Sequence, residues 1–79
     1  MKEMFLVDWL SFTGMPLKKF AKEIGVDPST VSNYNSKKRV PTLKVAREIH
    51  RVTNGRVTMD KLLEWYESED YENRIPTKK

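Results

Sequence analysis

The sequence contains no cysteine and only one histidine, His50, and this shortage excludes several kinds of site. Without cysteine there is no thiol nucleophile, no disulfide framework and no zinc finger. One histidine with no second histidine to join it does not complete a metal site, so we interpret His50 as an exposed surface residue. We therefore expect a protein with no metal and no cofactor.

Long apolar runs are also absent from the sequence. The longest one, residues 4–7, is shorter than the core of a signal peptide and much shorter than a membrane span. We therefore expect a soluble, cytoplasmic protein that makes no membrane contact. The sequence also has no nucleophile–base pair, no metal-ligand set and no phosphate-binding glycine loop, so we do not expect an enzyme.

The length of 79 residues is that of one small domain. A chain of this size buries only about 60% of the surface that its unfolded form exposes, which argues against a large enclosed active site. Because no second domain for sensing a ligand is expected, no small-molecule ligand is expected either.

Positive charge is concentrated in the middle of the chain. The formal net charge is +4, but residues 14–59 carry ten basic residues against three acidic ones, whereas residues 60–79 carry four against six. A basic segment of this kind is the electrostatic pattern expected for a polyanion partner, although exposed lysines often do no more than keep a surface hydrated. Charge alone therefore leaves both interpretations open.

Apolar residues recur at helical spacing along almost the whole chain, and no segment alternates with period two for long enough to require a strand. This pattern predicts an all-α domain of five short helices in residues 1–67, followed by a disordered tail at residues 68–79. The first helix, within residues 2–12, should turn a broad apolar stripe inward and should end at Gly14. The stripe comprises Phe5, Leu6, Trp9, Leu10 and Phe12.

Proline, glycine and capping residues mark the second and third helices. Met15-Pro16 should open the second helix, with proline at the first helical position, and Gly25 should stop it. The third helix should have Asp27 as its side-chain cap and Pro28 at its first position. Its inward residues should be Val31 and Tyr34.

The last two helices carry similar signals. Residues 35–41 are too polar and broken for a helix and should form a loop. Thr42 should then cap the fourth helix, which Asn54-Gly55 closes, and Thr58 should cap the fifth.

Residues 17–36 have the pattern of two helices that pack around a tight turn. Ala21 is small where the two helices cross, and Gly25 permits a left-handed turn that a Cβ atom would disfavour. Apolar side chains fill the angle between the helices; they are Ile24, Val26, Val31 and Tyr34. This segment resembles the helix-turn-helix of phage Cro and repressor proteins and their bacterial relatives, and the resemblance extends over about residues 4–63.

The resemblance implies a lambda repressor/Cro-like DNA-binding domain whose third helix enters the major groove. The residues expected to face the base edges are Pro28, Ser29, Ser32 and Asn33. The Asn33 amide offers a donor and an acceptor together, which is what bidentate recognition of adenine requires. Since no arginine or glutamine projects from this helix, direct readout should be modest and DNA shape should carry much of the specificity.

The resemblance also implies contacts to the sugar-phosphate backbone on both sides of the third helix. The expected phosphate-contacting residues are Lys18, Lys19, Ser36, Lys37, Lys38 and Arg39. Relatives often have a polar residue such as glutamine at the start of the second helix, where this chain has Leu17. The two lysines that follow it, or the backbone N–H groups of that helix end, would have to replace the contact.

These expectations lead to a sequence-specific regulator of transcription, a Cro-like repressor that binds double-stranded DNA at a pseudo-palindromic operator as a homodimer. We expect Trp9 in the core and the dimer contact in the C-terminal helix, although the first helix is an alternative. The candidate dimer residues are Met59, Leu63, Trp65 and Tyr66.

A second hypothesis is an antitoxin or anti-repressor that acts by binding another protein. It would use the same helical scaffold or the acidic segment at residues 64–72. The two functions are compatible, as in antitoxins that regulate their own synthesis.

Overall fold

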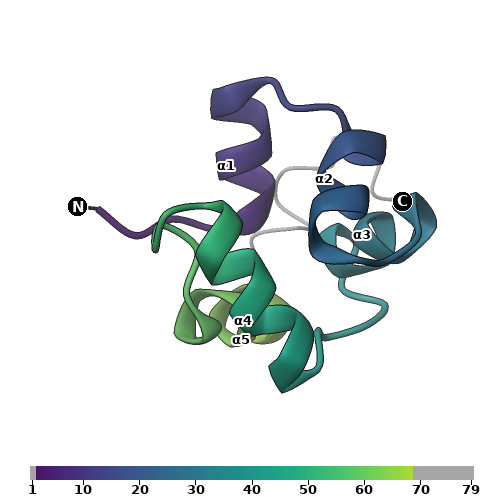
Figure 1. The fold of residues 1–79 in the computed structure, drawn as a ribbon. Helices are drawn as coiled ribbons and strands as arrows, with labels where there is room; N and C mark the ends of the chain where they lie inside the picture. Colours follow the sequence, from purple (N-terminus) through teal and green to yellow (C-terminus); the bar gives the residue numbers. More distant parts are fainter. Residues whose placement is uncertain (1, 69–79) are drawn as a thin grey trace.

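The computed structural model describes residues 2–68, and within them the chain forms five α-helices and no β-strand (Figure 1). The helices are α1 (Leu6–Thr13), α2 (Leu17–Ile24), α3 (Pro28–Asn35), α4 (Leu43–Val52) and α5 (Met59–Glu67). The all-α prediction of five short helices is confirmed. Except for Ser68, the predicted tail lies outside the described residues.

The helices are arranged around α2, which packs against both α3 and α4, while α4 packs against α5. In Figure 1, α2 and α3 lie on one side of the molecule and α4 and α5 on the other. The start of the chain is held to the α4–α5 connection, because the Met4 N–H donates to the Arg56 carbonyl at 2.8 Å. No helix within residues 2–68 is long and apolar enough to cross a membrane.

One core joins all five helices. Phe20 and Ala21 of α2 and Val31 of α3 have no exposed surface, and the Phe20 ring lies 5.6 Å from the Trp9 ring between their centres. The other buried apolar residues of the cluster are Leu6, Leu10, Ile24, Tyr34, Ala46, Ile49, Val57 and Leu62. Burial of each large apolar side chain contributes roughly 1.5–3 kcal/mol, and this burial stabilises a domain that has no cysteine to form a disulfide.

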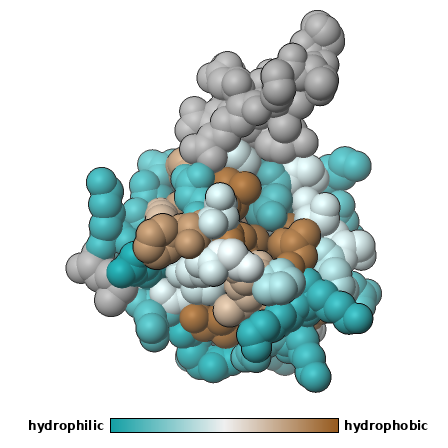
Figure 2. All heavy atoms as spheres, turned by 90° about the horizontal axis from the view of Figure 1, so that it is seen from above, coloured by the Kyte–Doolittle hydropathy of each residue, from teal (hydrophilic) through white to brown (hydrophobic). Residues whose placement is uncertain are grey.

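The prediction for α1 was partly wrong. Leu6, Trp9 and Leu10 are buried, but the Phe12 side chain is 72% exposed. The helix begins at Leu6, and at 100° per residue Phe12 lies more than 100° from the centre of the buried arc. Seen from above, on the side where the α1–α2 connection lies in Figure 1, the surface shows apolar residues among hydrophilic ones (Figure 2).

Two of the predicted helix caps are confirmed. The side-chain oxygen of Thr42 accepts a hydrogen bond from the Val45 N–H at 3.3 Å, and that of Thr58 accepts one from the Lys61 N–H at 3.2 Å. Each bond satisfies a donor that the first turn of a helix otherwise leaves without a partner.

The predicted side-chain cap of α3 was wrong. Asp27 occupies the cap position, but its carboxylate accepts no capping hydrogen bond. Its backbone carbonyl accepts hydrogen bonds from the Thr30 and Val31 N–H groups at 3.0 and 3.3 Å. The start of α2 differs by one residue, because Pro16 precedes the helix with extended backbone and Leu17 is the first helical residue.

The prediction that Trp65 lies at a dimer surface was also wrong. Its side chain is only 4% exposed, its ring lies 5.3 Å from the Phe5 ring between their centres, and its indole N–H donates to the Asn35 carbonyl at 3.1 Å. The inner face of α5 is formed by Leu62 and Trp65, three residues apart. Trp65 therefore joins α5 to the end of α3.

The α4–α5 connection is organised by Thr53, which is 1% exposed. Its hydroxyl donates to the Ile49 carbonyl at 2.8 Å and accepts from the N–H of Val57, itself fully buried, at 3.1 Å. A buried N–H group that loses its acceptor retains its full desolvation cost.

Thr53→Val should therefore destabilise the domain by about 1–3 kcal/mol, because the side chain keeps its shape and the Val57 N–H loses its acceptor. Thr13→Val is the matched control: Thr13 donates to Trp9 at 2.9 Å and accepts from Met15 at 3.3 Å in the same way, but at an exposed site. Its expected cost is below about 0.5 kcal/mol. Urea unfolding measures both, and equal losses would contradict this account of Thr53.

Candidate nucleic-acid interface

The turn between α2 and α3 is closed by backbone hydrogen bonds around Gly25. This residue has a φ of 81°, and the Val26 N–H donates to the Ala21 carbonyl at 2.9 Å. Glycine is suited to this left-handed conformation because it has no Cβ atom. The tight turn places α3 against α2 at a fixed angle, as the sequence predicts.

α3 is held by its inner side and exposes the other. Val31 and Tyr34 are buried, whereas Pro28, Ser29 and Ser32 are exposed. Asn33, which is half-buried, lies four residues after Ser29 and therefore on the same side of the helix. Within residues 2–68 no hydrogen bond engages the Ser29, Ser32 or Asn33 side chains, so their polar groups are available to a ligand.

Exposed basic residues occur in the chain both before and after α3. Lys18 and Lys19 are exposed on the first turn of α2, and Lys38 and Arg39 are exposed in the loop after α3. Ser36 is half-buried, and its hydroxyl donates to the Asn33 carbonyl at 3.4 Å. Of the predicted phosphate-contacting residues, the structure thus leaves Lys18, Lys19, Lys38 and Arg39 exposed.

The Lys37 side chain points toward the end of α5, unlike those of the exposed lysines. Its ammonium donates to the Ser68 backbone carbonyl and to the Ser68 hydroxyl, the latter at 3.2 Å, and lies 4.8 Å from the centre of the Trp65 ring. These partners belong to the C-terminal end of α5, and Lys37 is half-buried there.

Tyr34 supports the surface without adding charge to it. Burial raises the pKa of its hydroxyl above the ordinary value, and the positive charge of Arg39 opposes this rise. The phenol is therefore neutral at physiological pH and places no negative charge beside the basic residues.

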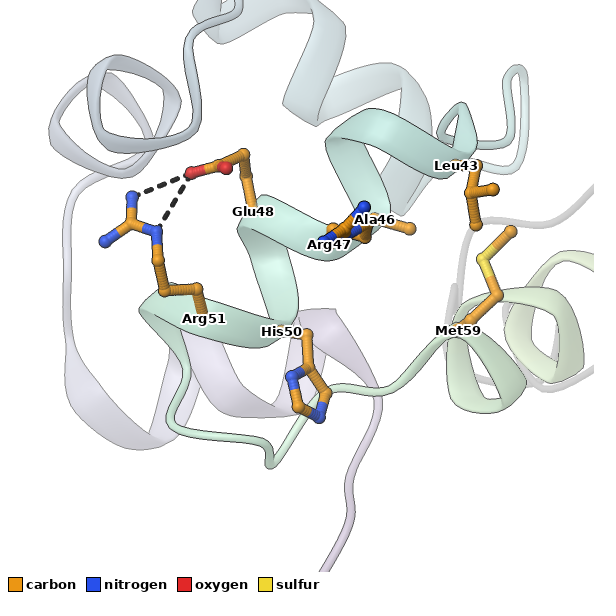
Figure 3. Close-up of a pocket in the computed structure, with 7 residues that line it drawn as sticks. All are labelled: Leu43, Ala46, Arg47, Glu48, His50, Arg51 and Met59. Atoms are coloured by element: carbon orange, nitrogen blue, oxygen red, sulfur yellow. Dashed lines mark hydrogen bonds and ion pairs between the residues drawn. The ribbon is translucent and has the colours of Figure 1, made fainter.

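A second exposed surface was missed in part by the sequence prediction. Met59, Leu63 and Tyr66 recur at helical spacing along one side of α5; Leu63 is 38% and Tyr66 43% exposed, whereas Met59 is partly buried against the core. Leu43, at the start of α4, is 67% exposed and points toward Met59 across a hollow of about 390 Å³ (Figure 3). We call these four residues the α4–α5 apolar surface. One leucine in a first helical turn gives no sequence signal for its exposure.

The same view shows His50 on α4, where it also lines this hollow (Figure 3). His50 is exposed, as predicted, and no group of three or more histidine, cysteine, aspartate or glutamate residues that could hold a metal occurs within residues 2–68. The Arg51 guanidinium pairs with Glu48 at 2.8 Å on the surface of α4, where such pairs contribute little to stability.

If the outer side of α3 serves a ligand and not the fold, replacing Ser29, Ser32 and Asn33 together by alanine should change the free energy of unfolding by less than about 1 kcal/mol. Val31→Ala in the same helix should cost roughly 2 kcal/mol or more, because it removes fully buried methyl groups. Chemical denaturation compares the two variants. A large loss in the triple variant would show that these polar residues maintain the fold.

Comparison with known proteins identifies the family to which the helix-turn-helix and the helix after it belong. A family model described as helix-turn-helix matches residues 13–61, more than half of the chain, and the match includes α2, α3 and α4. No curated protein and no solved structure gives a match. The fold, the α2–α3 turn and this match agree: the chain belongs to the Cro/repressor-like helix-turn-helix family of DNA-binding transcriptional regulators.

Proposed function

We propose that the protein is a Cro-like repressor that binds a pseudo-palindromic operator in double-stranded DNA as a homodimer and acts by excluding RNA polymerase. The observation that carries this proposal is the outer side of α3, where Ser29, Ser32 and Asn33 offer hydrogen-bonding groups that the described part of the chain does not use. A helix of this kind fits the major groove, where base edges present complementary donors and acceptors.

In this proposal the two groups of residues have different roles. Asn33 pairs with an adenine, Ser29 and Ser32 make adaptable contacts, and Pro28 touches a thymine methyl group. Phosphates are bound by Lys18 and Lys19 on one side of α3 and by Ser36, Lys38 and Arg39 on the other; all four basic residues are exposed. Because the base-contacting set is small, sequence-dependent DNA shape supplies a large share of the specificity.

Selection from a random duplex pool should yield one symmetric site. The affinities of variants for that site then distinguish base-contacting from phosphate-contacting residues. Asn33→Ala should weaken binding by about 1–3 kcal/mol, roughly 5- to 150-fold, and relax the preference at one position in each half-site. Lys38→Ala should weaken binding to all duplexes alike and reduce the slope of log affinity against log salt by about 0.9 per phosphate lost. Recovery of no preferred site, or binding that does not depend on salt, would contradict the proposal.

The dimer contact is assigned to the α4–α5 apolar surface. Leu63 and Tyr66 of this surface are exposed, so the fold of one chain does not bury them, whereas Met59 is partly buried against the core. Two copies related by a twofold axis would cover the same residues on each other, and this arrangement matches a palindromic site. One recognition helix reads only a few base pairs, so a second copy is needed for useful affinity.

Leu63→Glu should abolish the dimer, because it places a charge in an apolar contact. Leu17→Glu is the control with matched exposure, since Leu17 is 37% and Leu63 38% exposed, and it should leave the oligomeric state unchanged. Sedimentation equilibrium measures both variants beside the unmodified protein. If the Leu63 variant stays dimeric, the interface lies elsewhere. If the unmodified protein is monomeric even on DNA, the apolar surface favours the second candidate, an antitoxin or anti-repressor that binds another protein.

A further inference from the structure

Four of the helices are followed, within two residues, by a residue with left-handed backbone. Lys37, after α3, is the one among these whose residue type does not favour that conformation. Gly14 and Gly25 directly follow α1 and α2, with φ values of 72° and 81°, and Asn54, two residues after the end of α4, has a φ of 57°. Glycine and asparagine adopt this conformation readily. Lys37, two residues after α3, has a φ of 67° and no such chemical reason for it.

The left-handed backbone at Lys37 sets the direction of the loop. The Lys38 N–H returns to the Asn33 carbonyl at 2.9 Å, the Lys37 N–H donates to the Tyr34 carbonyl at 3.3 Å, and the Arg39 N–H shares the Asn33 carbonyl at 3.3 Å. This is the hydrogen-bond pattern of a Schellman motif, in which the left-handed residue is usually glycine. Lys38 and Arg39 therefore leave the helix in a direction that depends on Lys37.

The Lys37 side chain supplies contacts that favour this backbone. Its ammonium donates to the Ser68 carbonyl and hydroxyl at the C-terminal end of α5, where the helix dipole favours a cation. It also lies over the Trp65 ring, and a cation above an aromatic face is attracted by the ring. Trp65 in turn donates to the Asn35 carbonyl in the last turn of α3.

We propose that Lys37 is a positioning residue: its side chain fastens the loop after the recognition helix to the C-terminal end of α5, and so presents Lys38 and Arg39 to the DNA backbone without contacting a phosphate itself. This inference rests on the proposed DNA-binding function, and it replaces the sequence-based expectation that Lys37 binds a phosphate. For a phosphate contact, the ammonium would have to leave Ser68 and Trp65 while Lys37 kept its left-handed backbone.

Three variants test this role. Lys37→Met keeps the length of the side chain and removes the charge, Lys37→Arg keeps a cation that can reach Ser68 and Trp65, and Lys2→Met is a control that removes one exposed positive charge from the start of the chain. The first readout is hydrogen exchange of the Lys38 amide in the protein without DNA. The second is affinity for the selected duplex as a function of salt, measured where all variants are fully folded.

Lys37→Met should speed exchange of the Lys38 amide by about threefold to tenfold, and should weaken DNA binding by a similar factor with an unchanged salt slope. Lys37→Arg should restore both values, and Lys2→Met should leave the exchange rate unchanged. In a Trp65→Phe background, which removes the indole donor, the effect of Lys37→Met on exchange should shrink, since the two residues act together.

Either of two results would overturn the proposal: a salt slope reduced by about 0.9 in Lys37→Met, which marks a lost phosphate contact, or an unchanged exchange rate at Lys38. Failure of the proposed function gives a different result. If the unmodified protein binds no duplex, the regulator proposal fails, while hydrogen exchange still decides whether Lys37 fastens the loop.

Discussion

Burial of Val31 and Tyr34 is the constraint on which the rest of this molecule depends. α3 has eight residues, and a helix this short is not stable alone in water. Its conformation and direction come from the inner side of α2, where Phe20, Ala21 and Ile24 are buried in the same cluster. The polar side of α3 is exposed because the opposite side, with Val31 and Tyr34, is buried against the core.

The two ends of α3 are supported differently. At its start, the Gly25 turn gives a short connection that is closed by backbone hydrogen bonds between neighbouring residues and by packing of Val26 against the core. At its end, the support comes from a distant part of the chain, since Trp65 reaches the Asn35 carbonyl and Lys37 reaches Ser68. The geometry at the end of α3 therefore depends on the position of α5.

α5 consequently has two surfaces with separate tasks. Its inner face, Leu62 and Trp65, completes the core and holds the end of α3, while the exposed Leu63 and Tyr66 form part of the α4–α5 apolar surface. In the proposed dimer, the helix that joins the two copies is also the helix that holds the loop beside the DNA. Dimer geometry and phosphate contacts would then be linked through one rigid element, and operator spacing would be sensitive to changes in α5.

Local chemistry was enough to predict much of the fold from the sequence. The caps at Thr42 and Thr58 and the left-handed glycine at position 25 follow from short-range preferences that act within one turn of the chain. The exposed positions of α3 follow from helical period combined with the family pattern. The wrong predictions arose where one hydrophobic or polar residue had several possible environments. Phe12 was expected in the core and is exposed, whereas Trp65 was expected at the surface and is buried. The Asp27 carboxylate was expected to cap α3 and does not.

By itself, the sequence determined the all-α class, the helix-turn-helix and the polar composition of the outer side of α3, because these depend on spacing and residue type along a short stretch of chain. Only the tertiary structure decided which face of α5 is buried, that Leu43 lies beside Met59, and that Lys37 turns toward Ser68. These features join residues far apart in the chain, and helical period does not determine the angle at which one helix meets another.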